Sequence, residues 1–175
     1  MPVSAMFEEF SSGVTPEELP MHLREQAGVV WSLCGQGLFS WSVFKFYTIR
    51  LLTASGRFDS TQPYLLDLSY LRKLSAQQIV TISLQEIERL VPPTAEQKAS
   101  WRQALELIVP DVSLGDRLFG WFKPGEGVHF FSASRALGAI PDAEFAHAFA
   151  SIWLDPRTQR PALRQALLGS HDAEK

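Results

Sequence analysis

The chain has 175 residues, which is enough for one domain with a hydrophobic core of its own. Apolar residues make up 46% of it and charged residues 20%, the proportions of an ordinary globular protein. Its net charge is −3, and it contains no block of lysine or arginine. The charge therefore favours neither a nucleic-acid partner nor electrostatic docking to an anionic membrane.

Cys34 is the single cysteine, which excludes an intrachain disulfide and a cysteine zinc cluster. Residues 1–30 contain no basic segment followed by an apolar one, so we expect no secretory signal. No apolar run is long enough to cross a membrane either. We therefore expect a cytoplasmic protein with no membrane span.

The N-terminal part of the chain shows little periodicity, and we expect residues 1–28 to form an arm. Within it, Thr15 is a helix N-cap and predicts a short helix, which Pro20 interrupts. Residues 29–169 are predicted to form the domain, and residues 170–175 a polar tail.

The stretch around which the chain is organised is Leu33–Leu52. The preceding residues 29–34 predict a strand that ends at Gly35, and Gly37 completes a glycine pair. No third glycine follows to complete a dinucleotide fingerprint, so the pair indicates a close approach between two strands. From Phe39 onward, aromatic and β-branched residues without Gly or Pro predict one long strand.

Alternate residues of that strand share a face. One face carries Phe39, Trp41, Val43, Lys45, Tyr47, Ile49 and Leu51, and the other carries Ser40, Ser42, Phe44, Phe46, Thr48, Arg50 and Leu52. Both faces are largely apolar, with one cation each. We expect a central strand covered on both sides, with a lipophilic pocket on one of them.

The rest of the chain alternates between strand and helix patterns. A strand is predicted over residues 64–71, and helices begin at Ser75 and Thr94, each with a glutamine three residues later as a capping box. Residues 117–131 predict a hairpin around a Pro-Gly type II turn, and residues 132–140 a further short strand.

The last two predicted helices open at Pro141 and Pro161, and Gly169 closes the second of them. The order of strands, two helices, strands and two helices predicts an α+β domain.

Few residues suggest chemistry. The four histidines lack metal-ligand spacing, and neither a nucleophile elbow nor a phosphate-binding loop occurs, so we predict no catalytic residue, metal or cofactor. Lys45 and Tyr47 remain, inside an apolar strand. Either Lys45 reaches the surface and Tyr47 packs in the core, or the two face a cavity with a polar end for a carboxylate or phenolate.

Several short motifs occur along the chain in an order that resembles a known family. They are Leu33-Cys34-Gly35-Gln36-Gly37, Phe44-Lys45-Phe46-Tyr47, Gly115-Asp116, Pro124-Gly125-Glu126-Gly127, Phe145-Ala146, Ile152-Trp153-Leu154 and Leu167-Leu168-Gly169. With them, residues 29–169 resemble bacterial chalcone isomerase-like proteins. The resemblance implies a large antiparallel sheet with a layer of helices on one face, enclosing a lipophilic cleft.

The resemblance also implies site residues. Plant chalcone isomerases need an arginine just after the glycine pair, and in fatty-acid-binding relatives an arginine and a tyrosine hold the carboxylate. Here Phe39 occupies the arginine's position and Tyr47 matches the tyrosine. Arg50 is expected on the opposite face, where it is a poor substitute.

We therefore predict a non-catalytic protein that binds a fatty acid or other lipophilic small molecule. Its ligand-binding residues are Tyr47 at the polar end, with Phe39, Trp41 and Lys45. One alternative is an isomerase or lyase acting on an enone-type substrate, with Tyr47 as acid or base and Lys45 stabilising charge. Another is a structural protein whose cleft is filled by Phe39 and Trp41. The oligomeric state is left open.

Overall fold

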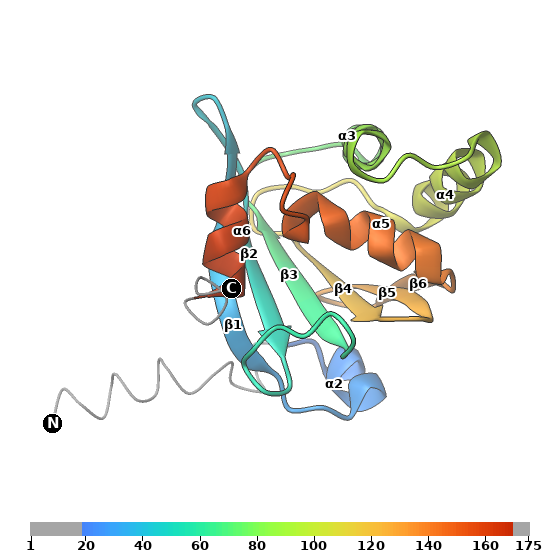
Figure 1. Ribbon diagram of the computed structural model, residues 1–175. Helices are drawn as coiled ribbons and strands as arrows, with labels where there is room; N and C mark the ends of the chain where they lie inside the picture. Colours follow the sequence, from blue (N-terminus) through green and yellow to red (C-terminus); the bar gives the residue numbers. More distant parts are fainter. Residues whose placement is uncertain (1–18, 170–175) are drawn as a thin grey trace, which may run out of the picture.

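The computed structural model describes residues 19–169, so the helix start at Thr15 and the tail 170–175 lie outside the described residues. A six-stranded antiparallel sheet forms the centre, with its strands in chain order (Figure 1). The strands are β1 (Ser32–Trp41), β2 (Phe44–Thr53), β3 (Tyr64–Tyr70), β4 (Arg117–Lys123), β5 (Gly127–Ser132) and β6 (Ala136–Ile140).

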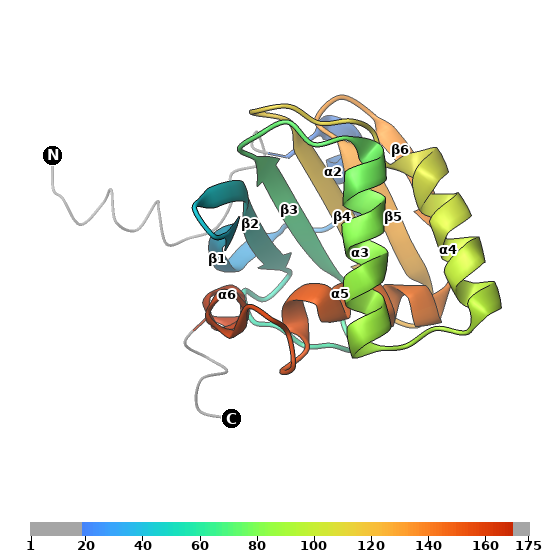
Figure 2. The same cartoon turned by 90° about the horizontal axis from the view of Figure 1, so that it is seen from above.

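Helices cover one face of this sheet, as Figures 1 and 2 show. They are α3 (Ala76–Leu90), α4 (Ala95–Ile108), α5 (Ala143–Leu154) and α6 (Pro161–Leu168). Helix α5 packs on β4 and β5, α6 packs on β1 and β2, and α3 packs on α5 and α4. The prediction of an α+β fold with an antiparallel sheet and a helical layer is confirmed. Within residues 19–169, no helix has both the length and the apolar character needed to cross a membrane.

The central stretch differs from the prediction. It forms a hairpin in which β1 and β2 are joined by a turn at Ser42 and Val43, so the prediction of one long strand from Phe39 is wrong. Ser42 adopts the left-handed region, with φ of 57°. In this hairpin Phe39 pairs across the strands with Tyr47. The two side chains are therefore neighbours as a cross-strand pair, and not as alternate residues of one strand.

The glycine pair lies inside β1, which does not end at Gly35. A Cβ atom on Gly35 would overlap the backbone carbonyls of Ala166 and Leu167, and one on Gly37 would lie 2.5 Å from Cδ1 of Leu163. The close approach is therefore real, but its partner is helix α6 instead of a second strand. It allows α6 to pack closely against β1.

The opposite face of the sheet has a smaller apolar cluster. The stretch 19–28, which we expected to belong to an arm, contains helix α2 (Met21–Ala27), and Leu19 and Leu23 are buried. They belong to a cluster with Trp31, Leu52, Leu65, Phe119, Trp121 and Phe131.

Beside this cluster, Asp67 is 1% exposed and accepts hydrogen bonds from Arg50 and Arg117. Arg50 therefore lies on the face away from Tyr47, as expected.

Most of the other predicted elements are confirmed. Both capping boxes form, at Ser75 and at Thr94. The β4–β5 hairpin turns at Pro124 and Gly125, where Gly125 has φ of 81° and the Glu126 amide donates to the Lys123 carbonyl. This geometry is that of a type II turn.

Candidate functional site

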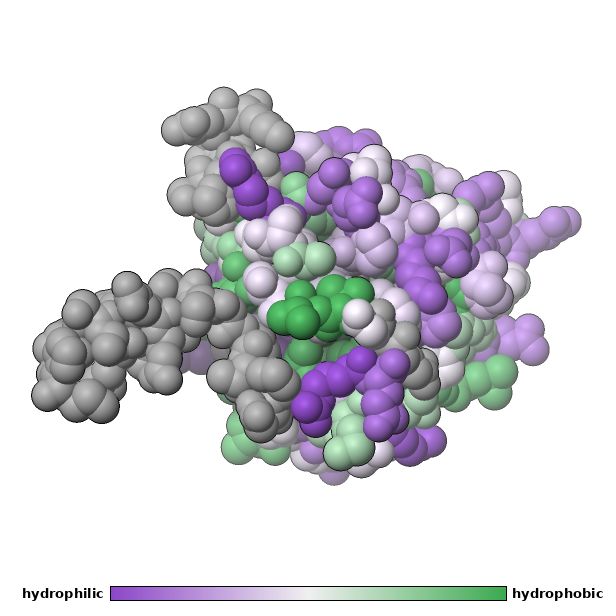
Figure 3. All heavy atoms as spheres, turned by 90° about the horizontal axis from the view of Figure 1, so that it is seen from below, coloured by the Kyte–Doolittle hydropathy of each residue, from purple (hydrophilic) through white to green (hydrophobic). Residues whose placement is uncertain are grey.

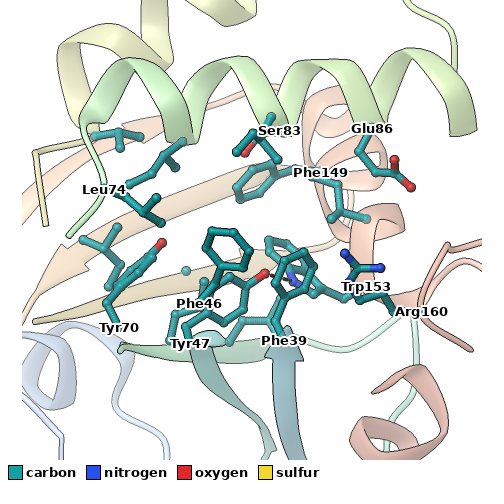
Figure 4. A pocket seen from close by; sticks show the side chains of 18 of the residues that line it. Phe39, Phe46, Tyr47, Tyr70, Leu74, Ser83, Glu86, Phe149, Trp153 and Arg160 are labelled. Carbon is teal, nitrogen blue, oxygen red and sulfur yellow. Dashed lines mark hydrogen bonds between the residues drawn. The ribbon is translucent and has the colours of Figure 1, made fainter. Parts of the chain in front are cut away.

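A cavity of about 440 Å³ lies between the helical layer and the sheet (Figure 4). Its volume is in the range of small-molecule sites. Strands β1 to β5, helices α3 and α5 and the segment before α6 contribute to its walls. The apolar and aromatic lining residues are Phe39, Trp41, Phe46, Tyr47, Leu66, Leu68, Tyr70, Leu74, Ile79, Ile82, Val109, Leu118, Phe119, Phe122, Phe130, Phe149, Ile152 and Trp153.

The cavity is apolar at one end and polar at the other. Figure 4 shows Tyr70 and Leu74 at one end and Glu86 and Arg160 at the other. The polar lining residues are Ser83, Gln85, Glu86 and Arg89 of α3, with Thr158, Gln159 and Arg160 from the segment before α6. The shape and polarity suit a molecule with a long apolar part and a polar head.

Arg160 is the distinctive cation at the polar end. Glu86 is already paired with Arg89. Within residues 19–169 no carboxylate forms an ion pair with Arg160, and its buried Nε atom has no hydrogen-bond partner. A buried donor that forms no hydrogen bond costs free energy, so binding of an anion by this guanidinium would be favourable.

Arg160 completes a stack of side chains around Tyr47. Its Cζ atom lies 4.4 Å from the centre of the Phe39 ring. That ring in turn stacks on Tyr47, with centres 4.8 Å apart and planes 10° apart. Trp153 Nε1 donates a hydrogen bond of 2.9 Å to the Tyr47 hydroxyl oxygen. This bond uses a lone pair of the oxygen, so the hydroxyl hydrogen can donate to a second partner.

Tyr47 is a neutral phenol at physiological pH. Burial raises its pKa far above the usual value, while the hydrogen bond from Trp153 and the positive charge of Arg160 act in the opposite direction without cancelling it. Burial, and to a lesser extent the neighbouring Tyr47, also raise the pKa of Tyr70. The two phenols therefore offer hydrogen-bond donors to the cavity and no negative charge.

The predicted site residues are only partly brought together. Phe39, Trp41 and Tyr47 line the cavity, although Trp41 is 67% exposed and Tyr47 is buried. Lys45 is exposed near the end of the hairpin and is not among the lining residues. Phe46, which strand alternation assigned to the other face, does line the cavity. The space that remains shows that Phe39 and Trp41 do not fill the cleft.

Arg160 was not among the residues predicted from the sequence. It lies directly before the helix-opening Pro161, and nothing in its local pattern marks it as a partner of a residue in β1. In the described part of the chain, no group of three or more His, Cys, Asp or Glu side chains could hold a metal ion.

Comparison with known proteins identifies the family. Residues 24–169 match the sequence model of a family described as chalcone isomerase-like. The chain belongs to the chalcone isomerase-like family. An uncharacterized protein of Haemophilus influenzae is 29% identical to this chalcone isomerase-like protein over 140 residues, which are 79% of this chain and 68% of the relative.

Among solved structures, the crystal structure of a fatty-acid binding protein from Arabidopsis thaliana superposes on the chalcone isomerase-like protein with a TM-score of 0.62. The match covers 79% of this chain and 86% of the plant chain, at 8% sequence identity. At such low identity the likeness shows the fold.

Proposed function

We propose that this chalcone isomerase-like protein binds a fatty acid, or a similar single-chain lipophile with an anionic head, in the cavity between α3 and the sheet. The observation that carries the proposal is Arg160, a cation without an ion-pair partner among the described residues, at the polar end of a mainly apolar cavity. A carboxylate there would satisfy the guanidinium, and the acyl chain would cover apolar walls. The fold likeness to the plant fatty-acid binding protein is consistent with this reading.

The cavity gives the ligand a direction. The carboxylate lies between Arg160 and the Tyr47 hydroxyl, each of which can donate a hydrogen bond to it. The acyl chain follows Phe46, Leu68 and Leu74 toward the apolar end. Phe39 and Trp41 contact the part of the chain next to the head.

Tyr47 is a poor acid or base for the alternative reading as an isomerase or lyase. With its pKa raised by burial, the phenol stays protonated at neutral pH and cannot take up a proton. The same protonated phenol is a good donor to a carboxylate, so the site is better suited to binding. On the sequence argument alone, we propose the cytoplasm as the location.

A paired-ligand experiment tests the proposal. Fatty acid binding is measured by displacement of a fluorescent fatty acid, alongside the fatty alcohol of the same chain length. We expect Arg160→Met to weaken binding of the acid by about 10- to 100-fold, the loss of one charge-assisted hydrogen bond, and to leave the alcohol nearly unchanged.

Arg102→Met, which removes a cation on α4 that lies within 4 Å of Glu106, is the matched control and should change neither affinity. Protein that binds neither ligand, and releases no lipid to mass spectrometry after solvent extraction, would overturn the proposed function. Equal losses for acid and alcohol would overturn only the position of the head.

A further inference from the structure

The end of the β1–β2 hairpin is an exposed apolar tip. We define this hairpin tip as residues 41–45. Trp41 is 67% exposed, Val43 84% and Phe44 52%. Figure 1 shows the hairpin extending past the other strands at the top of the molecule. Three large apolar side chains on a protruding turn are therefore mostly exposed to solvent, and exposed apolar patches of this kind mark interaction surfaces.

Cations surround this tip. Lys45 lies in the tip itself, and Arg72 and Lys73 follow β3 in the neighbouring segment, all exposed. Arg72 Cζ lies 4.9 Å from the centre of the Phe44 ring, which places that segment against the tip. Neither residues 38–45 nor residues 70–75 contain an aspartate or glutamate. The hairpin tip therefore combines apolar side chains with exposed lysine and arginine side chains in and beside it.

We infer that the hairpin tip docks the protein on the surface of an anionic lipid membrane. Tryptophan and phenylalanine suit the boundary between headgroups and acyl chains, and lysine and arginine beside them suit anionic headgroups. The net charge of −3 does not prevent this, because charges more than about 10 Å from the tip are largely screened at 0.1 M salt.

The tip is also continuous with the cavity. Trp41 belongs to both, since it lines the cavity and is exposed. Ile82 of α3 is a second exposed apolar residue of the lining. The cavity thus reaches the surface through apolar side chains. A lipid that leaves the bilayer beside the tip would contact these apolar side chains first. This transfer of a lipid rests on the proposed function, whereas docking on the membrane does not.

Other occupants fit less well. A second copy of the chain bound tip to tip would bring two groups of cations together. Elsewhere, Leu107 is an exposed apolar residue on α4. At the opposite end of the molecule, Figure 3 shows a hydrophobic patch near the centre, bordered by hydrophilic residues, and smaller hydrophobic patches near the edge. Exposed apolar side chains and exposed cations coincide at the hairpin tip.

Trp41 is a built-in probe for this docking. The other four tryptophans, Trp31, Trp101, Trp121 and Trp153, are buried. Protein without added fatty acid is mixed with phosphatidylcholine vesicles with or without about 30% phosphatidylglycerol, at about 0.1 M salt. We expect sedimentation with the anionic vesicles at least about tenfold tighter than with the neutral ones. A blue shift of Trp41 emission and quenching by brominated lipid should accompany it.

Val43→Asp and Lys73→Glu should each weaken vesicle binding by about tenfold. Neither residue lines the cavity, so fatty acid affinity measured without vesicles should stay unchanged. Leu107→Asp places the same charge on an apolar residue of α4 that is 82% exposed, and it should leave vesicle binding intact.

Three results would overturn the inference. They are no sedimentation with anionic vesicles, equal binding to neutral vesicles, and an equal loss with Leu107→Asp. A dimer in sedimentation velocity that Val43→Asp abolishes would also overturn it, in favour of a second copy at the tip. Because vesicle docking and fatty acid binding are measured separately, failure of one is distinguishable from failure of the other.

Discussion

The guanidinium carbon of Arg160 lies 4.4 Å from the centre of the Phe39 ring, so the cation that contacts Phe39 comes from the segment before α6 and not from β1. The family resemblance implies an arginine where Phe39 stands. In this chain the aromatic ring instead forms a platform, with Tyr47 on one side and Arg160 in contact with it. A positive charge at the polar end of the cavity is thus present, although the position expected to supply it is apolar.

Placing an arginine at position 39 tests this arrangement. Phe39→Arg removes the stack on Tyr47 and puts a second cation beside Arg160. We expect the ligand-free protein to lose about 2 kcal/mol of stability, from the lost aromatic pair and the like-charge contact. Added fatty acid should raise the Tm of Phe39→Arg more than that of the unchanged protein, because the carboxylate then neutralises two cations.

Phe39→Leu is the control for the lost ring. It should cost about 1 kcal/mol through the aromatic pair and show the ordinary increase in Tm with fatty acid. If Phe39→Arg gained no extra stabilisation from the acid over Phe39→Leu, the polar end of the cavity would lie elsewhere.

The sequence predicted most elements of the fold because their signals are local. The capping glutamines of α3 and α4 and the Pro-Gly turn of the β4–β5 hairpin act within a few residues. The β1–β2 turn had no such signal. Ser42 adopts a positive φ, a conformation usually found for glycine, asparagine or aspartate. Because none of these residues marks the turn, the aromatic segment from Phe39 onward was predicted to be one strand.

The site was less predictable because it is made by distant contacts. Tyr47 and Phe39 could be named from the strand pattern, but Arg160 reaches them through the seating of α6 on the glycines of β1. The hairpin tip could not be predicted from the sequence either, because it also depends on contacts between distant residues. The whole-chain charge of −3 does not reveal that the fold brings Arg72 against the Phe44 ring.

The three tyrosines of the chain, Tyr47, Tyr64 and Tyr70, should resist ionisation in the folded state. Burial raises the pKa of each. Below the unfolded value of about 10 both states are protonated and stability does not depend on these groups. Above it, the unfolded state loses protons that the folded state keeps, so stability falls as pH rises.

Tyrosinate absorbance measures this directly. At pH 11 the folded protein should show almost none, and protein unfolded in urea should show the signal of three tyrosinates. The urea concentration at the midpoint of unfolding should decrease as the pH is raised from 9 to 11. The decrease should be smaller in Tyr47→Phe, which removes one of the three phenols. Tyrosinate absorbance in the folded protein near pH 10 would contradict the burial of the phenols.

The contact between β1 and α6 should be intolerant of a methyl group at Gly35. A Cβ atom there meets the backbone of α6, which cannot turn aside, whereas one at Gly37 meets the end of the Leu163 side chain. We expect Gly35→Ala to cost about 3 kcal/mol and Gly37→Ala about 1 kcal/mol in urea unfolding. Because α6 begins just after Arg160, Gly35→Ala should also weaken fatty acid binding. A larger cost for Gly37→Ala would mean that α6 is seated differently.

Asp67 provides a test of whether the two faces of the sheet act independently. It is 1% exposed and accepts hydrogen bonds from Arg50 and Arg117, on the face away from the cavity. Asp67→Asn keeps the shape but removes the negative charge between two guanidinium groups, which should cost about 3 kcal/mol of stability. Fatty acid affinity should remain within about twofold, because a sheet of packed side chains separates Asp67 from the cavity.

Chemical denaturation and fatty acid displacement on the same preparation check both parts. Ser69→Ala, which removes a hydroxyl from the same face of β3, is the control and should alter neither quantity by more than about 0.5 kcal/mol. A strong loss of fatty acid affinity in Asp67→Asn, at a temperature where the protein stays folded, would show that the charges on the outer face influence the cavity through the sheet.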